Sequence, residues 1–367
     1  MATSASALPT LGWDPGWDAA FAPFSATGWQ PARVAAAHRG AWILATPGGD
    51  RDAVIAGRLR HEALGLADLP AVGDWVVVAG ESDDRGPAVI RAVLPRRTVF
   101  RRGSEEGHAI DDQVLAANVD VAFVVAGLDG DFNLRRLERY LAVAWSGGAT
   151  PVVVLNKAVV ASDLDGLRAA AGSVAPGTEI LAISALTGDG VADLAARHLA
   201  PGRTAVVLGS SGVGKSTLVN VLLGREHLRT GAVREDDSRG RHTTSHRELV
   251  RLPGGALLID TPGIRSLGVA GASEGLDPAF ADIMEIGAGC RFGDCRHERE
   301  PGCAIRAALA DGRLSHDRLA SHRKLEREAA HVARSGDGLS REAERKRWKI
   351  ISQASSRRMA EKYGRDR

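Results

Sequence analysis

The stretch "TAVVLGSSGVGKSTLVN", residues 204–220, decides the fold. An apolar run ends in "GSSGVGKST" (209–217), which has the spacing G-x-x-x-x-G-K-[ST], and a helical pattern follows. Glycines in such a loop let backbone N–H groups turn toward phosphate oxygens, and the helix start adds the positive end of its dipole. A strand, a glycine-rich loop and a helix in this order predict a phosphate-binding loop.

The loop and a second motif supply the groups that a nucleotide phosphate needs. Lys215 is expected to reach the β- and γ-phosphates, and the Ser216 hydroxyl to ligate magnesium. Downstream, "LLIDTPGIRSL" (257–267) places Asp260 at the end of a buried strand, where it can hold the magnesium shell through water. Gly263 can offer its N–H to the γ-phosphate. The loop residues expected to bind nucleotide are Gly209, Ser210, Ser211, Gly212, Val213, Gly214, Lys215, Ser216 and Thr217.

A polar segment between these motifs, "SRGRHTTSHRE" (238–248), has the character of a switch loop. Thr243 or Thr244 would complete the magnesium shell, and we prefer Thr244. Ile264 stands where many GTPases place the glutamine that orients the attacking water. His242 is therefore the candidate catalytic residue, because it can hydrogen-bond water beside the switch threonine. An ordinary exposed loop with an incidental histidine is the alternative.

Two upstream stretches carry base-reading motifs. "VVVLNKAVV" (152–160) places Asn156 and Lys157 after an apolar strand, and "ISALTGDG" (183–190) offers the backbone of Ser184 and Ala185 to guanine O6. The carboxylate that reads guanine N1–H and the 2-amino group is replaced by Val159, which accepts no hydrogen bond. Asp163 or Asp165 in the following loop could fill the role instead.

The order of these motifs predicts a circularly permuted α/β GTPase domain over residues 104–272. Base-reading motifs precede phosphate motifs, and a permutation moves the chain ends without moving the site. Near-continuous Val/Leu/Ile runs are typical of a parallel sheet buried on both faces, and apolar spacing predicts a helix over 134–145. The expected strands are 119–127, 150–156, 179–184, 204–209 and 256–260.

The N-terminal third of the chain has a different sequence pattern from that of the α/β domain. Residues 1–30 are expected to be an irregular extension, and residues 31–103 an OB-fold-like, RNA-binding β-barrel of five short strands, 33–40, 41–46, 53–60, 74–80 and 88–94. Arginine and aromatic side chains interleaved along these strands fit RNA binding, although a solvated barrel face explains most of them equally well. This set comprises Arg33, His38, Arg39, Trp42, Arg58, Arg60, Arg96 and Arg97.

The C-terminal domain, residues 273–367, is expected to be helical, and cysteine use predicts a structural zinc site in it. The chain has only three cysteines, all within 290–303. With one histidine they supply four soft ligands, the number that a closed tetrahedral zinc site needs. The alternative is three buried free thiols in a reducing cytosol. The expected ligands are Cys290, Cys295, His297 and Cys303.

The charge and hydropathy of the chain limit its expected location in the cell and its expected binding partners. Residues 313–367 hold 16 lysines and arginines against 8 acidic residues, in a chain whose net charge is +2. A basic helical tail of this kind suits a nucleic acid, with a solvated helix surface as the alternative. No basic leader and no long apolar run are present, which predicts a cytoplasmic protein with no membrane partner.

Together the motifs resemble the small ribosomal subunit biogenesis GTPase family, RsgA. The stretches that carry the resemblance are "LAANVDVAFVVAGLDGDFNLRRLERYL" (115–141), "GSSGVGKSTLVN", "GRHTT", "DTPGIR" and "CRFGDCRHEREPGCAI". The resemblance implies a GTPase, and the chain is expected to be a monomer that uses Mg²⁺ with GTP and one structural Zn²⁺. It also implies stimulation by the 30S subunit and its rRNA, a role late in small-subunit maturation, and hydrolysis supported by His242.

One departure from the family pattern keeps a second function open. The family has aspartate where this chain has Val159. The alternative is therefore a non-enzymatic or relaxed-specificity nucleotide-binding factor that assists rRNA assembly.

Overall fold

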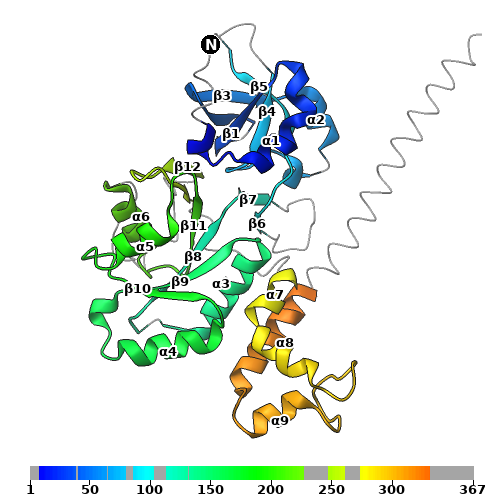
Figure 1. Cartoon of the computed structure of the whole chain (residues 1–367), viewed down its shortest axis with the longest axis vertical. Helices are drawn as coiled ribbons and strands as arrows, with labels where there is room; N and C mark the ends of the chain where they lie inside the picture. Colours follow the sequence, from blue (N-terminus) through cyan, green and yellow to red (C-terminus); the bar gives the residue numbers. More distant parts are fainter. Residues whose placement is uncertain are drawn as a thin grey trace, which may run out of the picture.

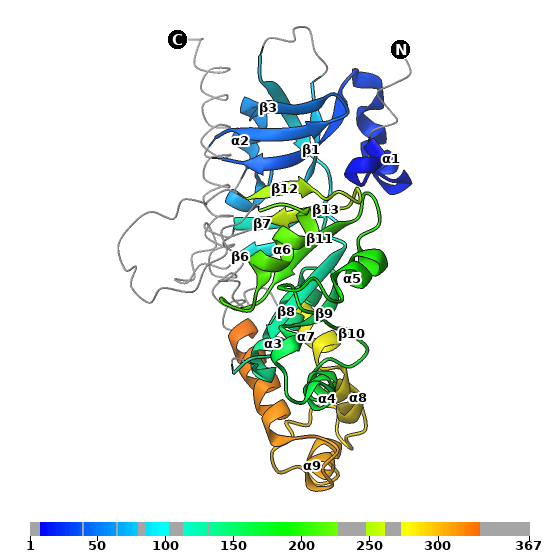
Figure 2. The same ribbon diagram turned by 90° about the vertical axis from the view of Figure 1, so that its left-hand side faces the viewer.

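Three bodies follow one another along an elongated molecule (Figures 1 and 2). A β-barrel lies at one end, an α/β domain in the middle and a helical unit at the other end. The computed structural model describes residues 8–38, 40–63, 65–79, 86–102, 113–130, 132–226, 247–260 and 273–330. Within these ranges no helix is both long enough and apolar enough to cross a membrane.

The N-terminal segment packs on one face of the barrel. Trp13 and Trp17 lie against Trp75 of the barrel, with ring centroids 4.7 and 6.1 Å apart. Asp14 caps a helix by accepting a hydrogen bond from the Trp17 N–H. The expected irregular structure is therefore wrong for most of this segment, because its aromatic side chains bury apolar surface on the barrel. The helices are η1 (Leu8–Leu11), α1 (Pro15–Phe21) and η2 (Ala22–Thr27).

Five strands close into the predicted barrel. Their order is β1-β2-β3-β5-β4, and β4 returns to pair with β1. β3 runs parallel to β5, while the other neighbours are antiparallel. Inward-pointing Val34, Leu44 and Ile90 are fully buried in its core. The strands are β1 (Gln30–Ala37), β2 (Trp42–Thr46), β3 (Gly49–Ile55), β4 (Trp75–Val78) and β5 (Ala88–Val93).

The strand expected over residues 53–60 is only partly present. β3 ends at Ile55, and the next residues form a short helix, α2 (Gly57–Glu62). Arg58 and Glu62 pair at 2.8 Å across one exposed turn of this helix. The arginines that looked like alternating strand residues therefore lie on a solvated helix.

Half of the side chains expected to form an RNA-binding surface have structural contacts instead. Arg33 and Trp42 are buried. Arg96 and Arg97 are held in ion pairs with carboxylates of the barrel and of the N-terminal segment. Arg39 lies outside the described residues. These eight side chains therefore cannot all belong to an RNA-binding surface of the barrel.

Six strands of the middle body form an open sheet in the order β10-β9-β8-β11-β13-β12. The first five are parallel, and β12 is antiparallel at the end next to the barrel. Alternate residues of β8, such as Phe123 and Val124, enter two different cores, which explains the continuous apolar runs. The strands are β8 (Val121–Gly127), β9 (Thr150–Asn156), β10 (Glu179–Ala182), β11 (Thr204–Leu208), β12 (Glu248–Arg251) and β13 (Leu257–Asp260).

Helices cover both faces of this sheet, as the prediction of a parallel sheet buried on both faces requires. Apolar residues of α3 and α4 belong to the core on one face, and those of α5 and α6 to the core on the other. The predicted helix over 134–145 is confirmed. The helices are α3 (Leu134–Ser146), α4 (Leu164–Val174), α5 (Val191–His198) and α6 (Lys215–Leu223), with the short turn η5 (Ala158–Val160); another short turn, η3 (Leu66–Asp68), belongs to the barrel.

A strand of the barrel pairs with a strand of the central sheet. Ala36 of β1 lies opposite Glu248 of β12, so one hydrogen-bonded sheet of eleven strands runs through both bodies. Figure 2 shows β12 directly below the barrel strands. A separate two-stranded ribbon lies at the same junction. Its strands are β6 (Val99–Arg102) and β7 (Gln113–Ala117).

The C-terminal unit is helical, as predicted, and packs on α3. Its core includes Phe280, Ile305 and Leu325, and Ala142 of α3 contributes to the same cluster. The helices are α7 (Ser273–Ala279), α8 (Ala281–Ala288), α9 (Ala304–Ala310) and a helical segment over residues 316–330.

Arg318 holds this unit to the central domain. Its buried guanidinium pairs with Glu138 of α3 at 2.7 Å and with Asp282 of α8 at 2.8 Å. It also donates to the Ala279 carbonyl at 2.8 Å and lies 4.2 Å from the Phe280 ring centroid. These carboxylates oppose the desolvation of the cation, and the pKa of Arg318 lies above its usual value.

Replacing Arg318 with methionine is expected to lower the free energy of unfolding by about 3–5 kcal/mol, because it leaves two carboxylates without their buried partner. Chemical denaturation followed by circular dichroism measures this. Arg135→Gln is the matched control, since Arg135 pairs across the same junction with Asp317 while both side chains are mostly exposed. It should cost less than about 1 kcal/mol. Equal losses in the two variants would contradict the role of Arg318.

Candidate nucleotide site

The phosphate loop lies between the end of β11 and the start of α6. Gly209, Gly212 and Gly214 all have positive φ, at 143°, 82° and 93°. A Cβ on Gly209 would stand 2.4 Å from the Val125 carbonyl oxygen, and one on Gly214 would stand 2.2 Å from the Asn156 amide nitrogen. Both the backbone conformation and the close approach therefore require glycine here.

Asn156 joins the phosphate loop to the base-reading loops. Its side-chain amide donates to the Val213 carbonyl at 2.8 Å, and its Oδ1 accepts from the Ala185 N–H at 2.9 Å. The side chain is 2% exposed, so these bonds form away from water. Three segments far apart in the sequence are thereby brought together at one point, as the permuted order predicts.

Lys157 has a carboxylate partner that sequence reasoning missed. The residue adopts a left-handed conformation, with φ at 65°. Its ammonium forms an ion pair with Asp129, which follows β8. The Leu128 N–H also donates to the Asn156 carbonyl at 2.8 Å, which fixes this loop beside β9. The carboxylate lies in "GLDGDFN", where nothing in the local pattern points to a lysine 28 residues away.

Val159 lies in the exposed turn η5 just after Lys157, with 56% of its surface accessible. Asp163, one of its possible substitutes, is engaged as the N-cap of α4: its Oδ1 accepts from the Gly166 N–H at 2.9 Å. Asp165 lies in the first turn of the same helix and is exposed. The position that reads guanine thus presents an apolar side chain.

The loop around Ser184 and Ala185 is closed by local hydrogen bonds. The Ser184 N–H donates to the Asp189 carbonyl at 2.9 Å, and the Thr187 hydroxyl donates to the Asp189 carboxylate at 2.6 Å. Leu186 at the tip of this loop is 84% exposed. Together with Val159 it gives the rim of the site an apolar character.

The phosphate end of the site is assembled at neighbouring strands. Lys215 folds over its own loop and donates to the Ser210 carbonyl. Asp260 ends β13, which pairs in parallel with β11, Val206 lying opposite Ile259. Asp260 therefore lies at the same edge of the sheet as the phosphate loop. The other residues expected here, His242, Thr243, Thr244, Gly263 and Ile264, lie outside the described residues.

The cysteine cluster lies at the far end of the C-terminal unit. The ligand atoms of Cys290, Cys295, His297 and Cys303 all lie within 4.8 Å of one another. The Cys290 and Cys303 sulfurs are 3.9 Å apart, and both are 3.4–3.5 Å from His297 Nδ1. Tetrahedral zinc with its usual bond lengths places two sulfurs about 3.8 Å apart and sulfur and nitrogen about 3.6 Å apart. The cluster could therefore hold zinc.

Hydrogen bonds between side chains and the backbone organise the loop of this cluster. The Glu300 carboxylate accepts from the N–H groups of Arg296, Glu298 and Arg299 at 2.8–3.0 Å. Backbone hydrogen bonds, including that of its own residue, lower the pKa of Glu300 to about 2. Arg323 donates to the His297 carbonyl at 3.2 Å, which ties the loop to the last helix. The loop can thus hold its shape around the four ligands.

Comparison with known proteins gives the family. A family model described as RsgA GTPase matches residues 93–270. A small ribosomal subunit biogenesis GTPase RsgA from Opitutus terrae is 50% identical to this chain over 359 residues, covering 96% of this chain and 97% of the relative. The chain belongs to the RsgA GTPase family. The RsgA protein of Streptomyces coelicolor is 44% identical, covering 94% of this chain and 92% of the relative.

Solved structures agree with the fold. YjeQ from Thermotoga maritima superposes with a TM-score of 0.59 at 23% identity, covering 81% of this RsgA-family chain and 97% of YjeQ. YloQ, described as a circularly permuted GTPase, superposes with a TM-score of 0.60 at 24% identity, covering 83% and 96%. The resemblance, the permuted fold and the GTPase class expected from the sequence are confirmed.

Replacing Asp129 with asparagine is expected to weaken GDP and GTP binding about threefold, because Lys157 loses an ion-pair partner that is one-third exposed. Titration with a fluorescent GDP analogue measures the change. Asp193→Asn is the control, since it breaks an exposed ion pair with Arg197 on α5. Unchanged affinity in Asp129→Asn would show that Lys157 needs no partner.

Proposed function

We propose that this chain hydrolyses GTP to GDP and phosphate on the small ribosomal subunit and assists its maturation. The observation that carries the proposal is the pair of hydrogen bonds by which Asn156 joins the phosphate loop at Val213 to the base-reading loop at Ala185, called the Asn156 clamp below. The relatives from Opitutus terrae and Streptomyces coelicolor are named small ribosomal subunit biogenesis GTPases. Their identity to this chain extends over nearly its full length.

The proposed chemistry gives each predicted site residue one role. The amides of the phosphate loop and Lys215 bind the phosphates and hold the γ-phosphate in line. Ser216, Thr244 and Asp260 are the residues that would hold Mg²⁺, which neutralises charge on the phosphates when bound. Gly263 would donate its N–H to the γ-phosphate. His242 would orient the attacking water, since Ile264 cannot.

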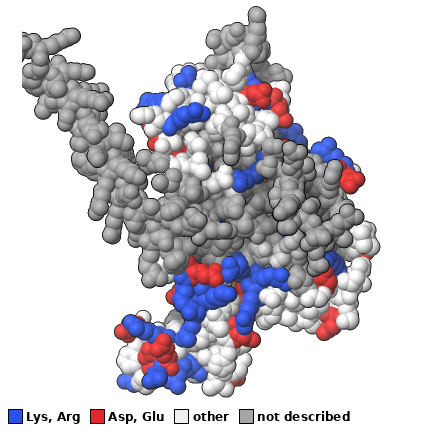
Figure 3. Space-filling view, turned by 180° about the vertical axis from the view of Figure 1, so that it is seen from behind, with Lys and Arg blue, Asp and Glu red and all other residues white. Residues whose placement is uncertain are grey.

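Charge on the surface supports a ribosomal RNA partner. Figure 3 shows lysine and arginine side chains gathered on one face, where the central domain meets the C-terminal unit. Such a surface attracts phosphate groups without regard to sequence. Of the basic tail, residues 331–367 lie outside the described residues. We propose that the chain binds the 30S subunit as a monomer in the cytoplasm.

The second candidate function rests on Val159. An exposed valine replaces the acceptor for guanine N1–H and the 2-amino group, and Asp163 is occupied as a helix cap. A site of this kind would bind the phosphates firmly and discriminate between bases weakly. The chain would then be an rRNA assembly factor with relaxed nucleotide specificity.

Turnover of GTP and ATP with and without 30S subunits tests the proposal. We expect slow hydrolysis by the free protein and strong stimulation by 30S subunits, because Ile264 stands where a glutamine would orient the attacking water. His242→Ala should abolish the stimulation and leave nucleotide binding intact. Equal turnover with and without subunits would refute ribosome-stimulated hydrolysis, and equal turnover of both nucleotides would favour the second candidate.

Restoring the carboxylate with Val159→Asp should tighten GTP about tenfold or more and ATP much less, because only guanine offers two donors to it. Calorimetric titration of both nucleotides measures the difference. Val160→Asp is the matched control, one residue along the same exposed turn. Equal tightening of GTP and ATP would indicate a more stable loop rather than base reading.

We propose that the four-ligand cluster holds one structural zinc. Cys295→Ser should then release the metal and lower the thermal stability of the C-terminal unit, while GDP affinity stays unchanged because the phosphate loop is in a different body. Metal analysis by mass spectrometry and differential scanning calorimetry measure the two effects. Wild-type protein purified without chelators that contains far less than one zinc per chain would contradict the assignment.

A further inference from the structure

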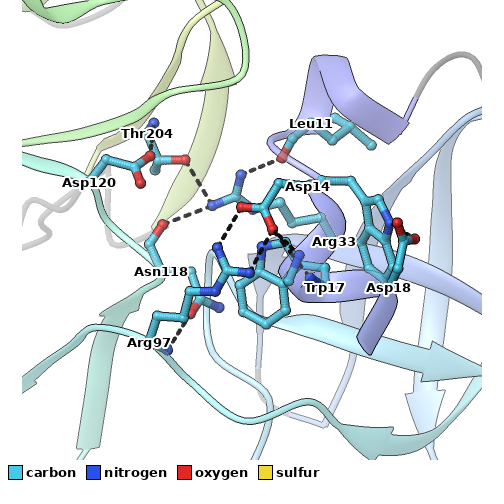
Figure 4. Close-up of polar contacts among 11 residues, drawn as sticks. Leu11, Asp14, Trp17, Asp18, Arg33, Arg97, Asn118, Asp120 and Thr204 are labelled. Atoms are coloured by element: carbon cyan, nitrogen blue, oxygen red, sulfur yellow. Dashed lines mark hydrogen bonds and ion pairs between the residues drawn. The ribbon is translucent and has the colours of Figure 1, made fainter. Parts of the chain in front are cut away.

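Arg33 lies at the point where the barrel, the N-terminal segment and the central domain meet (Figure 4). The side chain is 2% exposed. Its Nη2 donates to the Asn118 carbonyl at 3.0 Å and to the Thr204 hydroxyl at 2.8 Å. Its Nη1 donates to the Leu11 carbonyl, and its Nε to the Gly73 carbonyl at 3.2 Å. One guanidinium thus bonds to all three parts of the chain.

The N-terminal segment fits this junction closely. A Cβ on Gly12 would stand 2.6 Å from the Gly202 carbonyl oxygen, and one on Gly202 would stand 2.6 Å from the Pro9 carbonyl oxygen. Nearby, Arg97 pairs with Asp14 and lies 4.0 Å above the Trp17 ring. The segment is therefore wedged between the barrel and the turn that precedes β11.

Thr204 connects Arg33 to the nucleotide site along a short rigid path. It is the first residue of β11, and the phosphate loop begins at Gly209, directly after the strand. The Thr204 N–H donates to the Asp120 carboxylate at 2.7 Å, which anchors the strand at its start. Because β11 lies between β8 and β13 in the sheet, a shift of Thr204 is passed along the strand.

A second contact of the same barrel strand points in the same direction. β1, which carries Arg33, also pairs with β12 through Ala36 and Glu248. β12 pairs with β13, the strand that ends at Asp260. Movement of the barrel would therefore reach both strands that end at the phosphate site, β11 and β13.

Burying a cation between two bodies costs free energy, because the charge loses its contact with water. All four bonds of Arg33 go to neutral acceptors, three carbonyls and one hydroxyl. Burial lowers the pKa of Arg33 to about 10, so the group is still charged at neutral pH. Apolar side chains of similar volume would stabilise such a junction as well or better. What the guanidinium adds is a fixed direction for each bond, and hence one relative placement of the parts.

We propose that Arg33 is a positioning residue that couples the placement of the barrel and N-terminal segment to strand β11 and the phosphate loop. The inference rests on the proposed function, in that the coupling serves to transmit contact with the ribosomal subunit to the site of hydrolysis. Arg33 acts through Thr204 and does not touch the nucleotide.

The test removes the link at Thr204, where the change is small. Thr204→Val deletes the hydroxyl that accepts from Arg33 and keeps the size of the side chain, while Thr204→Ser keeps the hydroxyl. Arg33→Met removes all four hydrogen bonds of the guanidinium. Arg58→Met is the control at an exposed arginine of the barrel. GTP turnover is measured with and without 30S subunits, and GDP-dependent amide hydrogen exchange is measured in the free protein.

We expect Thr204→Val to lower the 30S-stimulated kcat at least about fivefold, the low end of typical coupling between sites, while basal turnover stays unchanged. Thr204→Ser and Arg58→Met should behave like the wild type. GDP should slow exchange in β1 and in residues 8–14 of the wild type and Thr204→Ser, but not of Thr204→Val or Arg33→Met. Binding at the phosphate loop has to stabilise the coupled parts if they are linked.

The exchange measurement decides the coupling independently of the ribosome. If wild-type turnover is not stimulated by 30S subunits, the proposed function fails, while GDP-dependent protection of β1 that disappears in Thr204→Val still supports the coupling. The coupling is wrong if GDP protects β1 equally in the wild type and Thr204→Val, or in neither. It is also wrong if Thr204→Ser is as impaired as Thr204→Val, because methyl packing would then be the cause.

Discussion

The nucleotide site depends on one buried amide. Asn156 satisfies the Val213 carbonyl and the Ala185 N–H, neither of which could be left unpaired in a closed site without a cost of about 1–3 kcal/mol. Its position at the end of β9 fixes Lys157 and the Asp129 loop, and its contact with Gly214 sets the path of the phosphate loop. The circular permutation leaves this arrangement unchanged, because the clamp depends on which strand ends are neighbours and not on their order in the chain.

Buried arginines specify how the three bodies are placed, and they do so differently. Arg318 is matched with two carboxylates, so its junction with the C-terminal unit is neutralised locally. Arg33 bonds only to carbonyls and a hydroxyl, and its charge is balanced at longer range by Asp74 and Asp120. The first arrangement is suited to a fixed attachment. The second makes the relative placement of barrel and sheet depend on several directed hydrogen bonds.

Patterns with local causes were predictable from the sequence, and contacts over long distances were not. The phosphate loop, the parallel strands, α3 and the ligand cluster follow from spacing and periodicity. The helices of residues 8–27 were missed because their tryptophans are stabilised by Trp75 of the barrel rather than by helical periodicity. The structural roles of Arg33, Arg96 and Arg97 were missed for the same reason, because the sequence alone does not show which partners an arginine will meet. The strand β12 was not predicted either, because it is stabilised by pairing with β13.

The pairing of β1 with β12 has a consequence for synthesis of the chain. More than two hundred residues separate Ala36 from Glu248, so this ladder has one of the largest sequence separations in the molecule. The barrel strands leave the ribosome first and can close on one another, whereas the end of β1 keeps an open edge until nearly 250 residues have been made. Completion of the sheet is therefore a late event with a high loop-closure cost. A nascent chain would complete the eleven-stranded sheet only after its first strand paired with one of its last.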